Sequence, residues 1–325
     1  MLNIFNCSII YLIFKEVDNL KNVLIIHNPH SGNRKDVYKI FEDSKELFER
    51  RGYKYNYIAT KYKGHAKEIV KDLKDIDLVI SVGGDGTFNE IVSGNMERED
   101  KIVMSHIPVG TANDLRSLFC LGRDIKENIK LILDGEDKQI DICTINNRPF
   151  VYVAGFGKFV NLSYETPKSQ KKRFGYLAYV KEFIKDMFKP INMYDIEYEI
   201  DGKKYRGNYS LGIISNANTI AGIKNFHKDV KLDDDKFEVI FCSISKRIKL
   251  LKNLFDLEVY DASKVDEIAM YKTNNLKIKF NNNLKKAFTI DGEKYPKKED
   301  YYDIKIYKKI KLRITKNAVK KNCIH

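Results

Sequence analysis

The amino-acid sequence predicts a two-domain protein in which an α/β domain precedes a β-rich, sandwich-like domain. The chain has 325 residues, more than a single hydrophobic core usually serves. In its first half, apolar strand-like segments alternate with segments of helical periodicity, which is typical of a parallel sheet covered on both faces. After about residue 135, short strand-like runs predominate. We therefore place the domain boundary at 135–140.

Strands and helices are expected to alternate along the first half. Apolar or alternating runs indicate strands over 23–27, 53–59, 78–82 and 102–107. Apolar residues near helical spacing indicate helices over 36–51, 65–73, 87–93, 112–119 and 125–133. This alternation is the pattern of consecutive βαβ units.

The second half is expected to be mostly β. Short strand-like runs lie within 140–155, and 194–215 has the pattern of a hairpin that turns at Asp201 and Gly202. Further strands are expected over 237–243, 276–280, 287–290 and 302–314, and helices over 176–188 and 249–257. A series of strands with few helices favours a sandwich or a barrel.

The composition favours an anionic partner. The formal net charge is +13, and lysine carries most of the excess. Such a balance suits nucleic acid, an acidic membrane surface or phosphate-bearing small molecules, and it also occurs in lysine-rich proteomes. No nucleic-acid-binding motif is recognisable in the sequence, which weakens the first of these.

The cysteines and the apolar segments indicate the compartment. The five cysteines form no CxxC pair, so reduced thiols in the cytoplasm fit better than disulfides or a thiolate zinc site. The apolar run at 8–14 is shorter than the about 20 residues that span a bilayer. It also lacks the basic flank of a signal peptide. We therefore expect a cytoplasmic protein that meets a membrane from one side.

The segment Gly83-Gly84-Asp85-Gly86-Thr87 is the strongest signal of a ligand site. It follows an apolar strand and opens a helix. Glycines let the backbone approach a ligand closely, and the N–H groups at a helix N-terminus face an anion. Because a carboxylate repels a bare phosphate, Asp85 indicates a metal ion or a hydroxyl group that receives a phosphoryl group. The alternative is an ordinary strand–turn–helix connection.

Two further polar loops follow expected strands. Asn28-Pro29-His30-Ser31-Gly32 comes after the first strand, and 108–114 comes after the strand at 102–107. In open parallel sheets, ligands bind at the carboxyl ends of the strands. Each loop alone could be a plain turn. Together, the three loops are expected to converge on one crevice.

Four motifs occur in one order along the chain: NPHSG (28–32), GGDGTFNE (83–90), PVGTANDL (108–115) and IDGE (290–293). In this the sequence resembles the diacylglycerol kinase and sphingosine kinase type of lipid kinase. The resemblance implies an α/β domain like those of NAD kinase and 6-phosphofructokinase, followed by a β-sandwich-like domain. The implied parts are an N-terminal extension (1–20), a nucleotide-binding domain (21–138), a lipid-binding domain (139–310) and a basic tail (311–325) that could return to the first domain.

The resemblance also implies a set of site residues. ATP would lie in the cleft, near Asn28, Pro29, His30, Ser31, Gly32, Thr60, Gly84, Asp85, Gly86, Thr87, Phe88, Asn89, Glu90, Thr111 and Asp114. Glu293 matches the family's proton acceptor, and Asp85 is the second catalytic candidate. Asp234 matches a magnesium ligand, with the carbonyl groups of Lys231 and Lys236 as companions.

Two of these assignments have plainer alternatives. Asp-Gly between two β runs is the commonest hairpin signal, so 291–293 could be an ordinary turn. The acidic run at 233–235 could be a solvated turn. The family usually has Asp-Gly where Asp234 and Asp235 stand, and the residues at 115–117 also depart from its pattern.

The leading hypothesis is an ATP- and Mg²⁺-dependent lipid kinase that converts diacylglycerol to phosphatidic acid in phospholipid biosynthesis. A carboxylate base suits this reaction because an alcohol is a poor nucleophile. One alternative is an NAD kinase-like phosphotransferase, since GGDGT occurs there too. Another is a catalytically idle, basic membrane-binding module.

The expected partner surface is an anionic membrane, contacted peripherally. Paired lysines at 171–172, 203–204, 285–286 and 308–309 could each contribute up to about 1 kcal/mol near such a surface. No nucleic-acid partner is expected, and a homodimer is left open.

Overall fold

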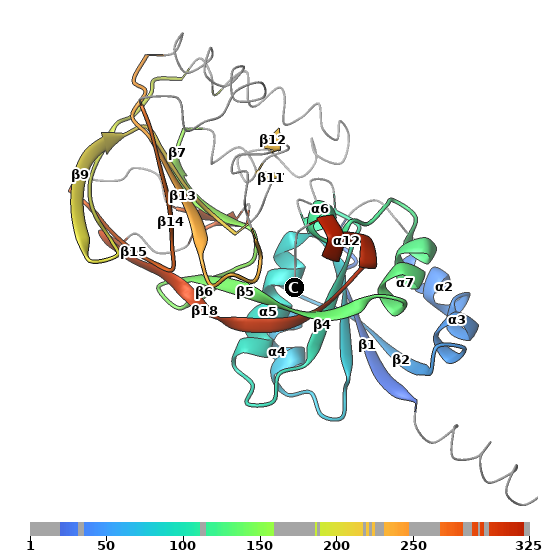
Figure 1. The fold of residues 1–325 in the computed structure, drawn as a ribbon. Helices are drawn as coiled ribbons and strands as arrows, with labels where there is room; N and C mark the ends of the chain where they lie inside the picture. Colours follow the sequence, from blue (N-terminus) through green and yellow to red (C-terminus); the bar gives the residue numbers. More distant parts are fainter. Residues whose placement is uncertain are drawn as a thin grey trace, which may run out of the picture.

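Two β-sheets form the frame of the protein, and the first runs through both halves of the chain (Figure 1). The computed structural model describes residues 20–31, 36–110, 115–158, 186, 189–216, 219–220, 223–224, 231–246, 267–281, 288–291, 293–295 and 299–321. Within these residues, the first sheet has ten strands, the second has six, and a separate ribbon has two. The expected α/β part followed by a β-rich, sandwich-like part is confirmed.

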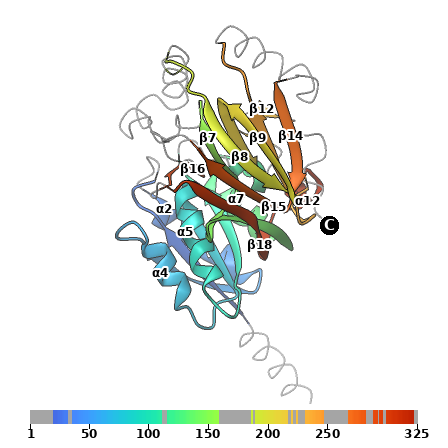
Figure 2. The same ribbon diagram turned by 90° about the vertical axis from the view of Figure 1, so that its left-hand side faces the viewer.

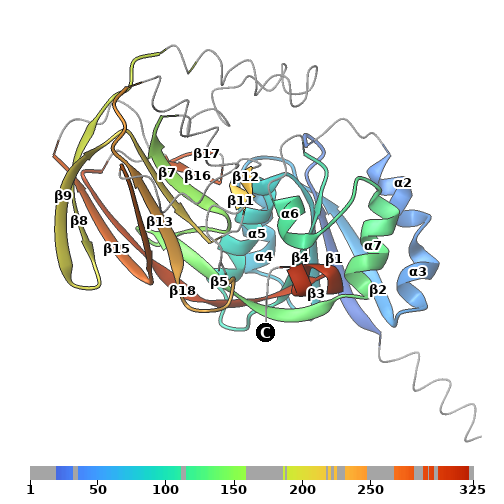
Figure 3. The same cartoon turned by 45° about the horizontal axis from the view of Figure 1, so that its top comes forward.

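Four parallel strands at one end of the first sheet form the α/β part. They are β1 (Lys21–His27), β2 (Tyr53–Ala59), β3 (Leu78–Gly83) and β4 (Val103–Pro108), in the order β2-β1-β3-β4. Helices α4 (His65–Lys71) and α5 (Asp85–Met96) lie on one face of these strands (Figures 1 and 3). Helices α2 (Val37–Glu42), α3 (Lys45–Glu49) and α7 (Ile125–Leu133) lie on the other. This double cover buries every residue of β3.

The helices differ from the prediction at two places. The helix expected over 36–51 is divided into α2 and α3, because the Ser44 hydroxyl donates to the Ile40 carbonyl at 2.6 Å and competes with helix continuation. Helix α5 begins at Asp85 rather than at Thr87. Helix α6 covers Leu115–Phe119, while all of 249–257 and nearly all of 176–188 lie outside the described residues. Among the described helices, none is long and apolar enough to cross a membrane.

The β-rich part contributes strands to both sheets. Its strands are β5 (Glu136–Ile145), β6 (Arg148–Phe150), β7 (Val153–Gly157), β8 (Tyr194–Ile200), β9 (Lys203–Tyr209), β10 (Leu211–Ser215), β11 (Thr219–Ile220), β12 (Ile223–Lys224), β13 (Phe237–Cys242), β14 (Ile268–Thr273), β15 (Asn275–Phe280), β16 (Thr289–Ile290), β17 (Glu293–Lys294) and β18 (Tyr301–Ile314), before helix α12 (Lys316–Lys321). The sequence did not predict β14. Aromatic side chains fill the space between the two sheets, with Phe156 packed edge-on against Phe280.

The hairpin expected over 194–215 is only partly as predicted. Strands β8 and β9 pair across the turn at Asp201 and Gly202, as expected. The chain then leaves the first sheet at Ser210, whose N–H donates to the Cys242 carbonyl at 2.8 Å. Strand β10 therefore pairs with β7 and β13 in the second sheet. One alternating run in the sequence thus serves two sheets.

Strand β18 connects the two parts of the protein. It pairs with β15 and β5 in antiparallel fashion, and Leu312 pairs with Met104 of β4 in parallel fashion. Its Arg313 guanidinium donates to both Asp137 carboxylate oxygens, at 2.6 and 2.8 Å. The boundaries predicted at 138–139 and 310–311 fall within β5 and β18. Helix α5 lies between the parallel strands and the β-rich part (Figures 1 and 2).

One histidine in the core makes stability depend on pH. The His106 side chain is fully buried, with ring centroids 5.2 Å from Phe88 and 6.1 Å from Phe119. Its two ring nitrogens have no hydrogen-bond partner among the described residues. Burial lowers its pKa to about 3. The folded protein therefore holds this ring neutral, whereas the unfolded chain protonates it below about pH 6.5.

We expect His106→Phe to weaken the loss of stability in acid. Because the folded pKa is depressed, the unfolded chain binds the extra proton as the pH falls from 6.5. The wild type should lose about 1.4 kcal/mol per pH unit from this group between about pH 6 and pH 4, and the variant should not. Urea unfolding at a series of pH values measures the difference. His65→Phe, at a partly exposed ring, is the control, and parallel curves for wild type and His106→Phe would contradict the expectation.

Candidate active site

The loop after β1 is hydrogen-bonded to the glycine-rich loop after β3. The Asn28 N–H donates to the Val82 carbonyl at 2.9 Å, and the Asn28 side-chain amide donates to the Thr87 hydroxyl at 3.0 Å. The Gly84 N–H donates to the Ser31 hydroxyl at 3.3 Å. A Cβ atom on Gly83 would lie 2.6 Å from Thr87 Oγ1, so this packing requires glycine there. Two of the predicted loops therefore meet.

The third predicted loop, after β4, lies against the same glycine-rich segment. The Val109 N–H donates to the Gly83 carbonyl at 2.9 Å, and the Leu115 N–H lies 3.4 Å from Asp85 Oδ1. The predicted residues Thr111 and Asp114, like Gly32 of the first loop, lie outside the described residues. The backbone on both sides of 111–114 nevertheless brings this loop to Asp85.

The segment after β2 meets the loops that follow β1, β3 and β4 near the N-terminus of α5. We call these four segments the cradle. The Thr60 N–H donates to the His27 carbonyl at 2.8 Å, and Thr60 is buried. The Glu90 carboxylate accepts a hydrogen bond from the Gly64 N–H at 2.8 Å. The segment 60–64 is therefore attached to α5 as well as to β1, and the predicted residues Thr60 and Glu90 belong to one assembly.

The N-terminus of α5 supplies the electrostatic character of this cradle. Gly84 is its N-cap, and no side chain of the described residues caps the first turn. Uncapped N–H groups and the helix dipole favour an anion at this end. Asp85 stands in the same turn, so a bound polyanion would meet a carboxylate beside the N–H groups. This combination suits a phosphate chain that is accompanied by a cation or a hydroxyl group.

His27 lies beneath the first loop and is neutral. Burial lowers its pKa to about 4, and the Tyr57 hydroxyl is hydrogen-bonded to its Nδ1. Burial also raises the pKa of Tyr57 to about 12. Near neutral pH this pair therefore adds no charge to the cradle.

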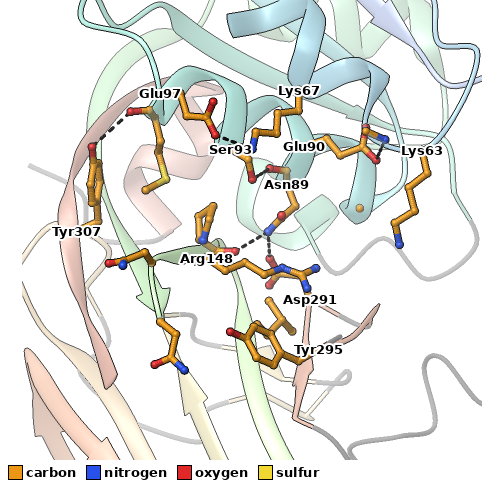
Figure 4. A pocket seen from close by; sticks show the side chains of 17 residues that line it. Lys63, Lys67, Asn89, Glu90, Ser93, Glu97, Arg148, Asp291, Tyr295 and Tyr307 are labelled. Carbon is orange, nitrogen blue, oxygen red and sulfur yellow. Dashed lines mark hydrogen bonds and ion pairs between the residues drawn. The ribbon is translucent and has the colours of Figure 1, made fainter. Parts of the chain in front are cut away.

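A cavity of about 640 Å³ adjoins the cradle along one side of α5 (Figure 4). The predicted residues Gly86, Asn89 and Glu90 line it, together with Lys63, Lys67, Arg148 and the tyrosines at 295 and 307. Lys67 forms an ion pair with Glu97 at 2.5 Å, and the Arg148 guanidinium lies 5.7 Å from the centre of the Tyr295 ring. The cavity therefore offers cationic, polar and aromatic groups to a ligand.

The Asp291-Gly292 turn is a hairpin turn, as its plainer alternative predicted. Ile290 of β16 pairs with Glu293 of β17, and β16 pairs with β7. The turn lies against α5, where the Asn89 amide donates to the Asp291 carboxylate at 2.8 Å. Burial raises the pKa of Asp291, against the effect of its hydrogen bonds. The backbone of Glu293 pairs with Ile290 next to this turn, while its side chain lies outside the described residues.

The loop at 231–236, which was predicted to bind a metal ion, lies against the carboxylate of Asp141. Asp141 was not identified as a site residue from the sequence. The Asp235 N–H donates to Asp141 Oδ2 at 2.7 Å, and the Asp141 N–H donates to the Leu232 carbonyl at 2.7 Å. Burial raises the pKa of Asp141 to about 6. The sequence signal that could have identified Asp141 is its position as a lone acidic residue within the apolar strand run at 140–145.

Asp234 keeps one oxygen available for a cation. Oδ1 of Asp234 and Oδ1 of Asp141 have no hydrogen-bond partner among the described residues, while the Lys272 ammonium lies 2.8 Å from Asp234 Oδ2. Such oxygens fit a hard cation. In the described part of the chain, no cluster of three or more His, Cys, Asp or Glu side chains is arranged to hold a metal ion. A site here would therefore need backbone carbonyls such as those predicted at Lys231 and Lys236.

Comparison with known proteins identifies relatives over most of the chain. Residues 22–145 match the family model of the diacylglycerol kinase catalytic domain. The chain is 30% identical over 277 residues to a diacylglycerol kinase of Bacillus subtilis, covering 84% of this chain and 90% of that protein. It is 36% identical over 224 residues to a diacylglycerol kinase of Staphylococcus epidermidis, covering 68% and 70%. A structure of a putative diacylglycerol kinase from Bacillus anthracis has the same fold, with a TM-score of 0.76 at 21% identity over 93% and 97% of the two chains.

We expect Asn28→Ala to destabilise the cradle. The substitution removes the amide that bonds Thr87 and the acceptor of the His30 N–H, so it should lower the free energy of unfolding by about 1–2 kcal/mol. Urea denaturation measures this loss. The control is Asn56→Ala on the exposed side of β2, which should change stability by less than about 0.5 kcal/mol. Equal effects of the two substitutions would show that the Asn28 contacts contribute nothing.

Proposed function

Because the chain belongs to the diacylglycerol kinase catalytic-domain family, we propose that it transfers the γ-phosphoryl group of ATP to the hydroxyl group of diacylglycerol and so forms phosphatidic acid. The observation that carries the proposal is the convergence of four strand-end segments on the N-terminus of α5. Asn28 and Ser31 come from the segment after β1, and Thr60 comes from the segment after β2. A triphosphate is the ligand that such a cradle suits best.

The cavity beside α5 supports the nucleotide part of the proposal. It begins at Gly86, next to the cradle, and continues past Glu90. Its volume lies within the usual range for pockets that hold small molecules and cofactors. We place the base and ribose of ATP at this end of the cavity, with Lys63 beside them. The triphosphate then extends toward Gly84 and Ser31.

The proposed reaction is an in-line phosphoryl transfer. The lipid hydroxyl oxygen forms a bond to the γ-phosphorus, the bond from that phosphorus to the β,γ-bridging oxygen breaks, and ADP leaves. The Glu293 carboxylate accepts the hydroxyl proton. Transfer of this kind depends mostly on positioning and charge neutralisation, and a general base adds to these. Asp85, in the first turn of α5, orients the reacting groups or their cation.

Mg²⁺ is the proposed metal ion, and its proposed ligands in the β-rich part are the Asp234 carboxylate with the Lys231 and Lys236 carbonyls. Among the described residues, Oδ1 of Asp234 and Oδ1 of Asp141 have no hydrogen-bond partner, which supports this assignment. When bound, Mg²⁺ supplies positive charge that offsets neighbouring carboxylates and phosphates. The chain's own contribution is the loop around Asp141, which holds Asp234 near that buried carboxylate.

Glu293→Gln and Asp85→Asn should each lower kcat for diacylglycerol by at least about 100-fold, because each removes a charged group from the reacting centre. Transfer of radiolabelled phosphate from ATP to diacylglycerol in mixed micelles measures the effect. Glu99→Gln, at an exposed loop position, is the matched control and should retain full activity. The same assay with phosphatidylglycerol, a sphingoid base and NAD defines the acceptor.

Three results of this assay would contradict the proposal. Full turnover by Glu293→Gln would exclude Glu293 as the base. Phosphorylation of NAD in preference to any lipid would favour the NAD kinase-like alternative. A wild-type protein that releases no ADP with any lipid would favour the idle membrane-binding module.

Asp234→Asn should abolish the thermal stabilisation that Mg²⁺ gives to the protein. A ligand that binds only the folded state stabilises it by about 2.7 kcal/mol at 100 times its Kd, so the wild-type Tm should rise with added MgCl2. Differential scanning calorimetry without nucleotide or lipid isolates this effect. Asp72→Asn, at the exposed C-terminus of α4, should respond as the wild type does. An equal rise in Asp234→Asn would place the ion elsewhere.

A further inference from the structure

The Asp291 carboxylate has an unusually complete set of donors. One oxygen accepts from the Asn89 amide at 2.8 Å and from the Val151 N–H at 2.9 Å. The other accepts from the Tyr152 N–H at 3.0 Å and the Val153 N–H at 3.1 Å. Hydrogen bonds to a charged acceptor are stronger than those between neutral groups. This carboxylate therefore fixes the turn against the segment between β6 and β7.

The side-chain amide of Asn89 makes a second hydrogen bond besides the one to Asp291. Its amide nitrogen also donates to the Pro149 carbonyl of β6 at 3.0 Å, so both of its N–H hydrogens have acceptors. The side chain is buried and lies one turn after Asp85 on α5. Figure 4 shows it directed toward Asp291. Although the motif places Asn89 in the nucleotide loop, its donors are directed to the β-rich part.

The hairpin that carries Glu293 is also attached to β7 through β16, and its Phe288 and Tyr295 side chains are buried in the aromatic core. Strands β16 and β17 have two residues each, and Asp291 itself adopts a left-handed backbone with φ of 45°. Its N–H donates to the Val153 carbonyl at 2.8 Å. The hydrogen bond from the Asn89 amide to the Asp291 carboxylate joins this hairpin to α5.

We infer that Asn89 and Asp291 are a positioning pair that sets Glu293 relative to the glycine-rich loop. The inference rests on the proposed function, because it assigns the pair to the orientation of the proposed base. The two residues are 202 positions apart in sequence and belong to different parts of the fold. Since a misplacement of about 1 Å can cost about 100-fold in rate, a hydrogen bond at this junction can control kcat without contacting substrate.

The test is a double-mutant cycle at positions 89 and 291, with kcat as the measured quantity. Asp291→Asn and Asn89→Asp should each lower kcat by about 100-fold, with the KM for ATP changed less than about threefold. In Asn89→Asp, two carboxylates face each other, so adding Asp291→Asn should raise kcat by about tenfold. The same substitution is thus harmful in the wild type and beneficial in the Asn89→Asp background. Only residues in direct contact are expected to show such a change of sign.

Asn89→Asp should also have a distinctive pH profile. Two adjacent carboxylates cannot both ionise easily, so the pair retains a proton at higher pH than a single carboxylate does. That proton restores a hydrogen bond between residues 89 and 291. The kcat of the variant relative to wild type should therefore increase as the pH is lowered from 8 to 6. An effect of general destabilisation would not follow this trend.

Asn95→Asp is the matched control for the Asn89→Asp background. Asn95 is a buried asparagine on the same helix, and its side chain is hydrogen-bonded to the Ile102 backbone rather than to the hairpin. Its substitution should lower Tm and leave kcat within about threefold of wild type. Asp291→Asn should remain harmful in this background. If Asp291→Asn does not fold, Asn89→Ala carries the test alone, with kcat expected to fall at least tenfold at an unchanged KM for ATP.

Distinct results separate the inference from the proposed function. Equal losses from Asp291→Asn in the Asn89→Asp and Asn95→Asp backgrounds would overturn the pairing. So would variants at 89 and 291 that lose Tm while retaining kcat, since the contact would then be merely structural. A wild-type protein that phosphorylates no lipid would overturn the proposed function, and the role of the pair with it.

Discussion

The pairing of β18 with strands from both parts of the chain is the constraint on which the rest of the structure depends. Residues 304–314 form a ladder with β5, and Leu312 meets Met104 at the edge of the parallel strands. Hydrogen bonds, rather than a linker, therefore set how the β-rich part lies against the α/β part. The cleft between them is a consequence of this continuous sheet.

Helix α5 makes the second connection, on the side of the parallel strands that faces the β-rich part. Its first turn belongs to the cradle, and Glu90 attaches it to the segment after β2. One turn beyond Asp85, Asn89 reaches β6 and the turn at Asp291. One helix therefore contacts both the proposed nucleotide site and the turn that precedes Glu293, the proposed base.

Carboxylates have different surroundings in different parts of the protein. Asp85 stands in the first turn of a helix, where N–H groups favour negative charge. Asp291 is surrounded by four donors, which suits a structural or positioning role. Asp141 is buried, and its Oδ1 has no hydrogen-bond partner within the described part of the chain, which suits a nearby cation. The arrangement of donors, and not the residue type, distinguishes these roles.

The sequence by itself determined the elements and the family. Mostly apolar runs predicted β1, β3 and β4, because a strand buried on both faces is mostly apolar. The glycine-rich motifs predicted loops at their carboxyl ends. Local patterning could not predict that the run at 203–215 divides between two sheets, nor that β14 forms, since both depend on partners distant in sequence.

Only the tertiary structure decided how the motif residues are used. The residues of the Asp-Gly turn alone favour a plain hairpin over a catalytic motif, and the fold makes it a hairpin whose carboxylate binds Asn89. The sequence likewise could not connect Asp141 with the loop at 231–236, or return β18 to β4. The physical reason is the same in each case. Short-range periodicity reports which face of an element is buried, whereas hydrogen-bond partners are chosen by the packing of elements far apart in the chain.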